Sequence, residues 1–251
     1  MEQRNNYLSL IEKRFEVNPA VALLGPRQSG KTTLAKLYSD KQPSSITVHW
    51  FDLEDPADLS ALQNAKTVLG SLEGLIIIDE VQKLPGLFPV LRVLIDQHVK
   101  GRQFLLLGSA SKDLIEKSSE TLAGRLSYIE VSPFSMTEVG DIKKLWHRGG
   151  YPKSYLSQSD ESALQWVKDY TAAFLERDLP MLGIKVPPEA MRRFWMMLAH
   201  CHGSVANLSE IGRSLGISHT TARHYLDILS SSFMIRQLQP WFANISKRQV
   251  K

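Results

Sequence analysis

The sequence of 251 residues has 30 lysines and arginines against 26 aspartates and glutamates, a formal net charge of +4. By itself this excess is too small to indicate a nucleic-acid partner. The hydrophobic fraction of 43% and the charged fraction of 22% are typical of a globular protein, so fibrous and disordered classes are excluded. The length suits one large domain or two ordinary ones.

Signals for compartment and membrane are few. Cys201 is the single cysteine, which excludes an internal disulfide and favours a reducing, cytoplasmic setting. The N-terminal residues show no apolar stretch of a signal peptide, and no apolar run reaches the roughly 18 residues of a membrane span. We therefore expect a cytoplasmic protein without a membrane partner.

The first predicted strand, at residues 20–24, runs into a phosphate-binding loop. Residues 25–33, GPRQSGKTT, have the Walker A spacing, and the residues after Gly30 open a helix. Backbone N–H groups of such a loop converge on the β- and γ-phosphates, Lys31 adds a positive charge, and the Thr32 hydroxyl completes a Mg²⁺ shell. We predict nucleotide contacts from Gly25, Pro26, Arg27, Gln28, Ser29, Gly30, Lys31, Thr32 and Thr33.

A second predicted strand, residues 46–50, precedes a group of acids. Asp52, Glu54 and Asp55 could support the Mg²⁺ shell or cap the helix that starts near Pro56. We favour capping and supporting roles for them.

The third predicted strand, residues 75–78, is fully apolar and ends in Asp79 and Glu80. Open α/β sheets bind ligands at the carboxyl ends of their strands, so both acids are expected at the nucleotide. Asp79 is predicted to hold the Mg²⁺ shell. Glu80 is placed to orient a water molecule for attack on the γ-phosphate.

Two further strands are predicted at residues 104–107 and near residues 127–131. In P-loop ATPases with an inserted central strand, the position of Ser109 touches the γ-phosphate or the water, although a plain helix cap is equally open. Five strands alternating with helices predict an α/β fold, a P-loop NTPase parallel sheet flanked by helices.

Beyond about residue 150 the pattern becomes helical. Residues 160–180 form one predicted helix with Leu164, Val167, Phe174 and Leu175 on one face, and residues 187–203 form another. We expect an ATPase domain over 1–148, a helical linker or lid over 149–203, and a winged helix-turn-helix with an incomplete wing over 204–251.

The last segment has helix-turn-helix spacing. A helix at 208–215 meets Gly216, a second begins after Ser218 and runs to about residue 229, and residues 233–238 are predicted as the first strand of a wing. The second helix would offer His219, Thr220, Arg223 and His224 to DNA, but Asp227 opposes this role. DNA contact and a lid or docking role both stay open.

These motifs, together with LAGRL, PFSMTEV and GGYP, closely resemble those of AAA-type ATPases that carry a DUF4143-type C-terminal region. The resemblance implies a cytoplasmic ATPase, an arginine near the nucleotide at Arg125, and an adenine contact at Pro152. Arg177 is a second candidate arginine. Family members usually continue into another domain, so we expect either a chain truncated at its C-terminal end or a shortened member of the family.

The sequence therefore predicts Mg²⁺-dependent binding and hydrolysis of ATP, coupled to movement of the C-terminal region. Lys31, Asp79, Glu80, Ser109 and Arg125 are the candidate catalytic residues, with Thr32 and Asp79 at the metal. ATP is favoured over GTP because no Asn-Lys-x-Asp guanine reader is present. The alternative is a non-enzymatic ATP-dependent switch with negligible turnover that regulates DNA or a protein partner. A Mg-ATP kinase acting on a small substrate is disfavoured, because the sequence shows no arginine-rich lid and no acceptor site. A homo-oligomer stays open as a further partner arrangement.

Overall fold

The computed structural model of the chain describes residues 4–109, 122 and 124–238. Its centre is a five-stranded parallel sheet in the order β2-β3-β4-β1-β5. All five predicted strands are present, and the insertion of a central strand is confirmed because β4 pairs with both β1 and β3. The strands are β1 (Ala20–Leu24), β2 (Val48–Asp52), β3 (Leu75–Asp79), β4 (Gln103–Gly108) and β5 (Leu126–Glu130).

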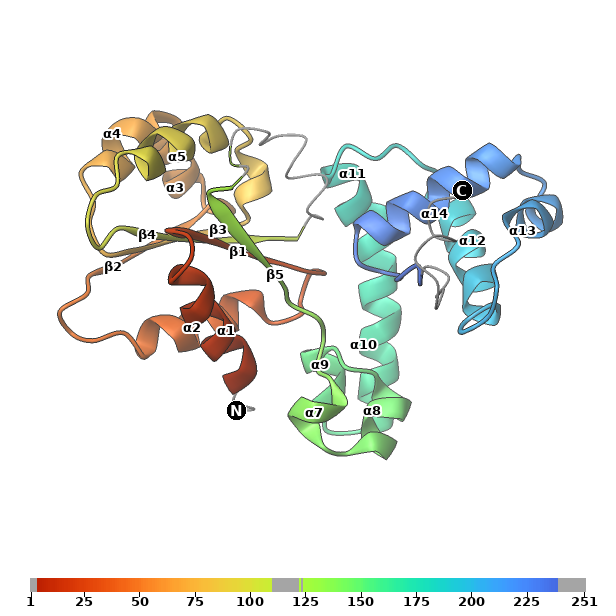
Figure 1. Cartoon of the computed structure of the whole chain (residues 1–251). Helices are drawn as coiled ribbons and strands as arrows, with labels where there is room; N and C mark the ends of the chain where they lie inside the picture. Colours follow the sequence, from red (N-terminus) through yellow and green to blue (C-terminus); the bar gives the residue numbers. More distant parts are fainter. Residues whose placement is uncertain (1–3, 110–121, 123, 239–251) are drawn as a thin grey trace, which may run out of the picture.

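Helices cover both faces of this sheet (Figure 1). The strands are apolar on both sides, so each face has its own core: Ile76 and Ile78 of β3 pack on one side, Leu75 and Ile77 on the other. One face carries α1 (Asn5–Phe15) and α2 (Lys31–Asp40), and the other carries α3 (Pro56–Ala61), η1 (Leu62–Asn64), α4 (Ala65–Gly70), η2 (Val81–Lys83) and α5 (Leu87–Asp96).

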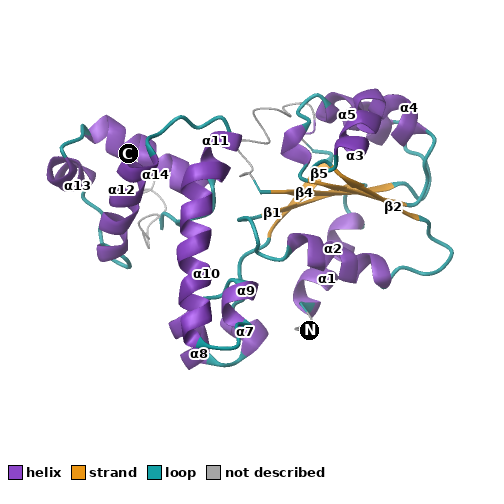
Figure 2. Ribbon diagram, turned by 180° about the vertical axis from the view of Figure 1, so that it is seen from behind, coloured by secondary structure: helices purple, strands orange, loops and turns teal. Residues whose placement is uncertain are grey.

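The rest of the described chain is helical and stands beside the sheet (Figure 2). It has a core of its own, in which Phe174 and Leu175 are buried as predicted. No helix in the described part of the chain is long and apolar enough to cross a membrane. The elements are α7 (Met136–Val139), α8 (Ile142–Arg148), α9 (Pro152–Tyr155), α10 (Asp160–Ala173), the π-helix η4 (Phe174–Asp178), α11 (Leu179–Met181), α12 (Pro188–His200), α13 (Leu208–Leu215) and α14 (His219–Ser231).

The predicted apolar face of α10 is wrong in its first half. Leu164 is 57% exposed and Val167 is 40% exposed. The buried face instead includes Ala163 and Tyr170, and Trp166 lies against Tyr170 with ring centroids 5.0 Å apart. Positions 163, 166 and 170 share one face of the helix by their spacing. Because this face is turned towards the core, Leu164 and Val167 point towards solvent.

The helix-turn-helix spacing is confirmed in α13 and α14. Gly216 adopts a left-handed conformation after α13, and the Ser218 side chain accepts a hydrogen bond from the backbone N–H of Thr221 at the start of α14. Gly and Ser at these positions act as expected for a helix end and a helix start.

The predicted first strand of a wing is absent from the described residues 233–238, which form turn and irregular structure. Phe233 has a φ of 62° and packs against the core on the face of the sheet that carries α3–α5. Arg236 Nη2 lies 2.6 Å from Glu130 Oε1 of β5. These contacts place the segment against the sheet domain in an irregular conformation. Residues 244–251, where we expected the wing to stop incomplete, lie outside the described residues.

Gly150 allows the backbone to pass close to Phe134. The Phe134 N–H donates to the Gly150 carbonyl at 2.7 Å, and a Cβ on Gly150 would stand 2.3 Å from the Phe134 carbonyl oxygen. This approach places Pro152 next to the phosphate-binding loop, with its Cγ 3.7 Å from the position of a Cβ on Gly30.

We expect Gly150→Ala to lower the free energy of unfolding by about 2 kcal/mol, because the methyl group forces the two backbones apart. Urea denaturation measures this change. Gly86→Ala is the matched control, since nothing lies within 4 Å of its added Cβ and its φ of −63° suits alanine. Equal midpoints for the two variants would contradict the assigned close approach.

Candidate nucleotide site

The loop between β1 and α2 forms one wall of the site. Gly30 has a φ of 92° at the N-cap of α2, and Gln28 has a φ of 60°. Left-handed positions such as these bend the loop tightly. The free N–H groups at the start of α2 then face the loop, which is the arrangement that binds phosphate at helix N-termini.

The Lys31 side chain spans the loop. Its side chain is only 5% exposed, and Nζ donates to the carbonyls of Gly25 at 3.0 Å and Pro26 at 2.9 Å. Burial lowers the pKa of Lys31 to about 8, although the nearby carboxylates of Glu80 and Asp79 oppose the shift. The protonated form of Lys31 is therefore expected to be stabilised when the phosphates of a nucleotide bind in the loop.

Nucleotide affinity is therefore expected to fall as the pH rises through about 8, approaching tenfold per pH unit. Phosphate favours the charged amine, so binding raises the pKa of Lys31, and above about pH 8 the site must first take up a proton. Calorimetry with Mg-ATP between about pH 7 and 9.5 measures this trend. In Lys31→Arg the cation stays charged, and its affinity should be flat over this range. A flat profile for the unmodified chain would contradict the prediction.

Thr32 and Asp79 form the expected metal position. The Thr32 hydroxyl donates to Asp79 Oδ2 at 2.7 Å, and Asp79 Oδ1 accepts from the Glu80 N–H at 2.9 Å. Burial raises the pKa of Asp79, more than the Thr32 hydrogen bond lowers it. These oxygens fit Mg²⁺, which takes few protein ligands. The described residues contain no cluster of three carboxylate, histidine or cysteine ligands, so phosphate and water would complete the shell.

Glu80 lies beside the expected metal position, and its carboxylate accepts hydrogen bonds from two side chains. The backbone at Glu80 is left-handed, with a φ of 53°. Its Oε2 accepts from the Ser109 hydroxyl at 3.2 Å and from Gln82 Nε2, which also donates to Ser109 at 3.0 Å. The structure thus brings together two predicted residues and adds Gln82, which sequence reasoning missed. The short helix η2 places the Gln82 side-chain amide next to Glu80. No sequence pattern predicts this contact.

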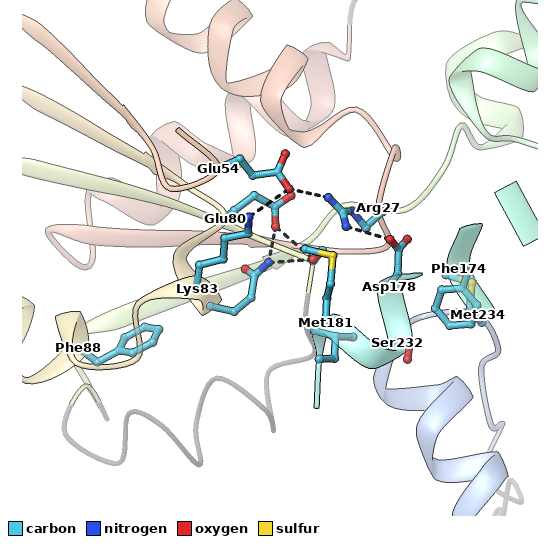
Figure 3. Close-up of a pocket in the computed structure, with 13 residues that line it drawn as sticks. Arg27, Glu54, Glu80, Lys83, Phe88, Phe174, Asp178, Met181, Ser232 and Met234 are labelled. Atoms are coloured by element: carbon cyan, nitrogen blue, oxygen red, sulfur yellow. Dashed lines mark hydrogen bonds and ion pairs between the residues drawn. The ribbon is translucent and has the colours of Figure 1, made fainter. Parts of the chain in front are cut away.

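Arg27 connects the loop to two other parts of the chain (Figure 3). Its Nη2 lies 2.7 Å from Glu54 Oε1, and its Nη1 lies 3.0 Å from Asp178 Oδ1 of η4. The Tyr170 hydroxyl donates to the Arg27 carbonyl at 3.3 Å. Glu54 therefore pairs with the loop, and the predicted helix cap is Asp55, which accepts from the Ala57 N–H at 2.8 Å.

A cavity of about 240 Å³ lies between the sheet domain and the helical region. Arg27 and Glu80 line it on the side of the sheet, and Phe174 and Met181 line it on the other (Figure 3). Ser109 also lines it on the side of the sheet. The cavity joins the candidate water-activating carboxylate to the C-terminal region.

Arg4 is a second contact that the sequence did not reveal. It is buried, and its Nη1 donates to the Ser29 carbonyl of the loop at 3.0 Å. Its Nε pairs with Glu138 Oε1 at 2.6 Å, and Nη2 donates to the Ser132 carbonyl at 2.7 Å. Arg4 thus ties the start of the chain to the phosphate-binding loop and to the segment after β5.

The structure corrects the expectation for Arg125. Its Nε lies 2.5 Å from Asp96 Oδ1 at the end of α5. Arg125 precedes β5, whereas the loop follows β1, and these strands are parallel with Ala20 paired to Leu126. Arg125 and the loop therefore lie at opposite ends of these neighbouring strands, about 17 Å apart for a strand of five residues. Arg125 thus lies away from the phosphate-binding loop of its own chain.

Arg177, the second candidate arginine, has a side chain that is 60% exposed. Its Nε lies 3.1 Å from Asp178 Oδ1, the same oxygen that pairs with Arg27 of the loop. Pro152 lies beside the loop at Gly30, and its adenine contact stays a prediction of the family resemblance.

A parallel five-stranded sheet with helices on both faces and a phosphate-binding loop after β1 defines a P-loop NTPase fold. Residues 17–140 match the family model described as AAA domain. Together these findings support an AAA-type nucleotide-binding domain over residues 17–140. Residues 139–251 match a different model, Domain of unknown function (DUF8612), so the expected DUF4143-type region is not confirmed.

The chain is also similar to particular proteins. It is 46% identical over 249 residues to uncharacterized proteins of Mycobacterium bovis and Mycobacterium tuberculosis, an overlap of 98% of this chain. The chain spans 56% of the length of these relatives. A Walker-type ATPase of Pyrococcus abyssi has a similar fold, with a TM-score of 0.61 over 92% of this chain and 90% of that one. Its identity of 15% shows the fold alone.

Proposed function

We propose that the chain binds Mg-ATP at residues 25–33 and hydrolyses it to ADP and phosphate. The observation that carries this proposal is the Thr32–Asp79 contact of 2.7 Å, placed directly beside Glu80 at the end of β3. Lys31 and the loop N–H groups bind the β- and γ-phosphates. Thr32 and Asp79 would hold Mg²⁺, which neutralises charge on the phosphate oxygens.

Glu80 is proposed to act as the general base. A water oriented by its carboxylate attacks the γ-phosphorus, the bond from that phosphorus to the β–γ bridging oxygen breaks, and Glu80 takes the proton of the water. Ser109 and Gln82 position the Glu80 carboxylate through their hydrogen bonds. The absence of a guanine-reading motif in the sequence supports ATP over GTP.

Hydrolysis is proposed to act on the C-terminal region through the loop. Tyr170 and Asp178 both contact Arg27, so a change in loop contacts after phosphate loss is felt in α10 and η4. We keep the division into residues 1–148, 149–203 and 204–251 as part of this proposal.

The test is phosphate release from Mg-ATP by the purified chain, compared with Lys31→Ala. We expect turnover that needs Mg²⁺ and is lost with the lysine. The rival is a switch that binds ATP without turnover, and it is favoured by the Glu80 carboxylate, which is already held by Gln82 and Ser109. Tight ATP binding with phosphate release no faster than in Lys31→Ala would support the switch.

DNA remains a proposed partner of α14. His219, Thr220, Arg223 and His224 are all exposed on this helix, as a recognition helix requires. Asp227 is exposed on the same helix and opposes phosphate contact. Double-stranded DNA added to the phosphate-release assay tests this role, since stimulation would support it and unchanged turnover would favour a lid or docking role.

A further inference from the structure

The Arg27 side chain forms ion pairs that are not needed for the loop backbone to bind phosphate. Its guanidinium bridges Glu54, which follows β2, and Asp178, which belongs to the C-terminal region. Asp178 is only 6% exposed. The buried carboxylate therefore depends on its arginine partners, because a buried charge without a partner is strongly unfavourable.

Arg27 also belongs to the electrostatic surroundings of the phosphate position. It lines the same cavity as Glu80 and Ser109 (Figure 3). Burial lowers the pKa of Arg27, but nearby carboxylates, among them Asp178 and Glu80, outweigh it and raise the pKa. The charge of Arg27 in turn helps to lower the pKa of Lys31. One guanidinium thus faces the residues proposed for binding and for hydrolysis.

We propose that Arg27 is the arginine that senses the γ-phosphate within the same chain. When ATP binds, its guanidinium leaves Asp178 and donates to γ-phosphate oxygens, and it returns to Asp178 when phosphate leaves. This inference rests on the proposed ATPase function. A guanidinium suits phosphate because its parallel N–H groups match two oxygens, and it stabilises the charge of the transferring group. Arg27 would supply what Arg125 cannot supply from its place beside Asp96.

The exchange would link nucleotide state to the C-terminal region. Once Arg27 has moved, Asp178 keeps only Arg177 of its two arginine partners in the described structure, at 3.1 Å. Loss of one partner from a buried carboxylate destabilises the arrangement around η4. Trp166 reports on this change, because it packs against Tyr170, whose hydroxyl donates to the Arg27 carbonyl.

The experiment measures the affinities of the full chain for Mg-ADP and for the β,γ-imido analogue of Mg-ATP, together with phosphate release from ATP. We expect Arg27→Met to weaken binding of the analogue about 10- to 100-fold while ADP affinity changes less than about twofold. Phosphate release should fall about 100-fold or more. Arg27→Lys keeps a charge but loses the planar fork, and its loss of analogue affinity should be intermediate.

Asp178→Asn gives an opposite, independent result. With the competing carboxylate neutralised, Arg27 moves more readily, so preference for the analogue over ADP should rise. The analogue should change Trp166 fluorescence in the unmodified chain and not in Arg27→Met, with Trp166→Phe assigning the signal. Arg92→Met is the matched control, because Arg92 lies on the exposed side of α5 and 3.9 Å from Asp96, away from the loop.

The experiment distinguishes failure of γ-phosphate sensing by Arg27 from failure of the proposed ATPase function. If Arg27→Met and Asp178→Asn leave the ratio of analogue to ADP affinity unchanged while Lys31→Ala abolishes binding, the site binds nucleotide but Arg27 does not sense the γ-phosphate. If the unmodified chain binds neither nucleotide, the proposed function and this inference fall together. Equal weakening of both nucleotides by Arg27→Lys would likewise overturn the sensing role.

Discussion

Glu80→Gln is expected to slow phosphate release by about 100- to 10,000-fold while ATP stays bound. The amide keeps the size and the hydrogen bonds of the side chain but cannot take a proton from water. The metal position at Thr32 and Asp79 is untouched, so ATP affinity should change less than about threefold. Steady-state phosphate release and calorimetry with Mg-ATP measure the two quantities.

Glu73→Gln is the control for this substitution. Glu73 is an exposed acid just before β3, at the opposite end of the strand from Glu80, so its loss should leave turnover unchanged. A Glu80→Gln variant that releases phosphate as fast as the unmodified chain would show that another group activates the water.

Arg4→Met is expected to have the largest effect on folding. Arg4 and Glu138 are 5% and 7% exposed, and the substitution leaves the Glu138 carboxylate buried beside Ser135 alone. Breaking a buried pair from one side costs about 3–5 kcal/mol. The variant also frees the Ser29 carbonyl, so the loop should bind ATP more weakly. Urea denaturation measures the loss, and Arg4→Met with Glu138→Gln should recover part of it.

The stabilising effect of this pair depends on pH in a definite direction. Burial alone would raise the pKa of Glu138, but the hydrogen bonds and charge of Arg4, together with Ser135, hold it below the ordinary value of 4.5. The contribution is therefore complete above about pH 4.5 and is lost as the pH falls through the lowered value. The stability difference between the unmodified chain and Arg4→Met should shrink in acid. A difference that grows below about pH 4 would contradict the assignment.

The sequence predicts the sheet and the centre of the site because both depend on local patterns. Apolar runs that end in glycine or acid mark β1 and β3, and the spacing from Gly25 to Thr32 fixes the loop. Strand ends then place Asp79 beside Thr32 without any knowledge of the rest of the chain.

The contacts that surround this centre could not be predicted, since they join distant residues. Arg27 and Asp178 are 151 positions apart, and Arg4 and Glu138 are 134 apart. No periodicity connects such pairs. The position of Arg125 was inferred from a family resemblance, which did not anticipate its pairing with Asp96. The prediction of a wing strand at residues 233–238 was wrong for a similar reason. Packing of Phe233 against the core of the sheet domain overrides the local preference for a strand.

The most direct test of the account is a single-turnover experiment with the unmodified chain in excess over ATP labelled at the γ-phosphate. With Mg²⁺ present, the account predicts that the bound ATP is converted to ADP and phosphate in one exponential phase. Chelation of Mg²⁺, or the Glu80→Gln substitution, should leave the ATP intact on the protein. ATP that remains bound and uncleaved on the unmodified chain with Mg²⁺ would contradict the account.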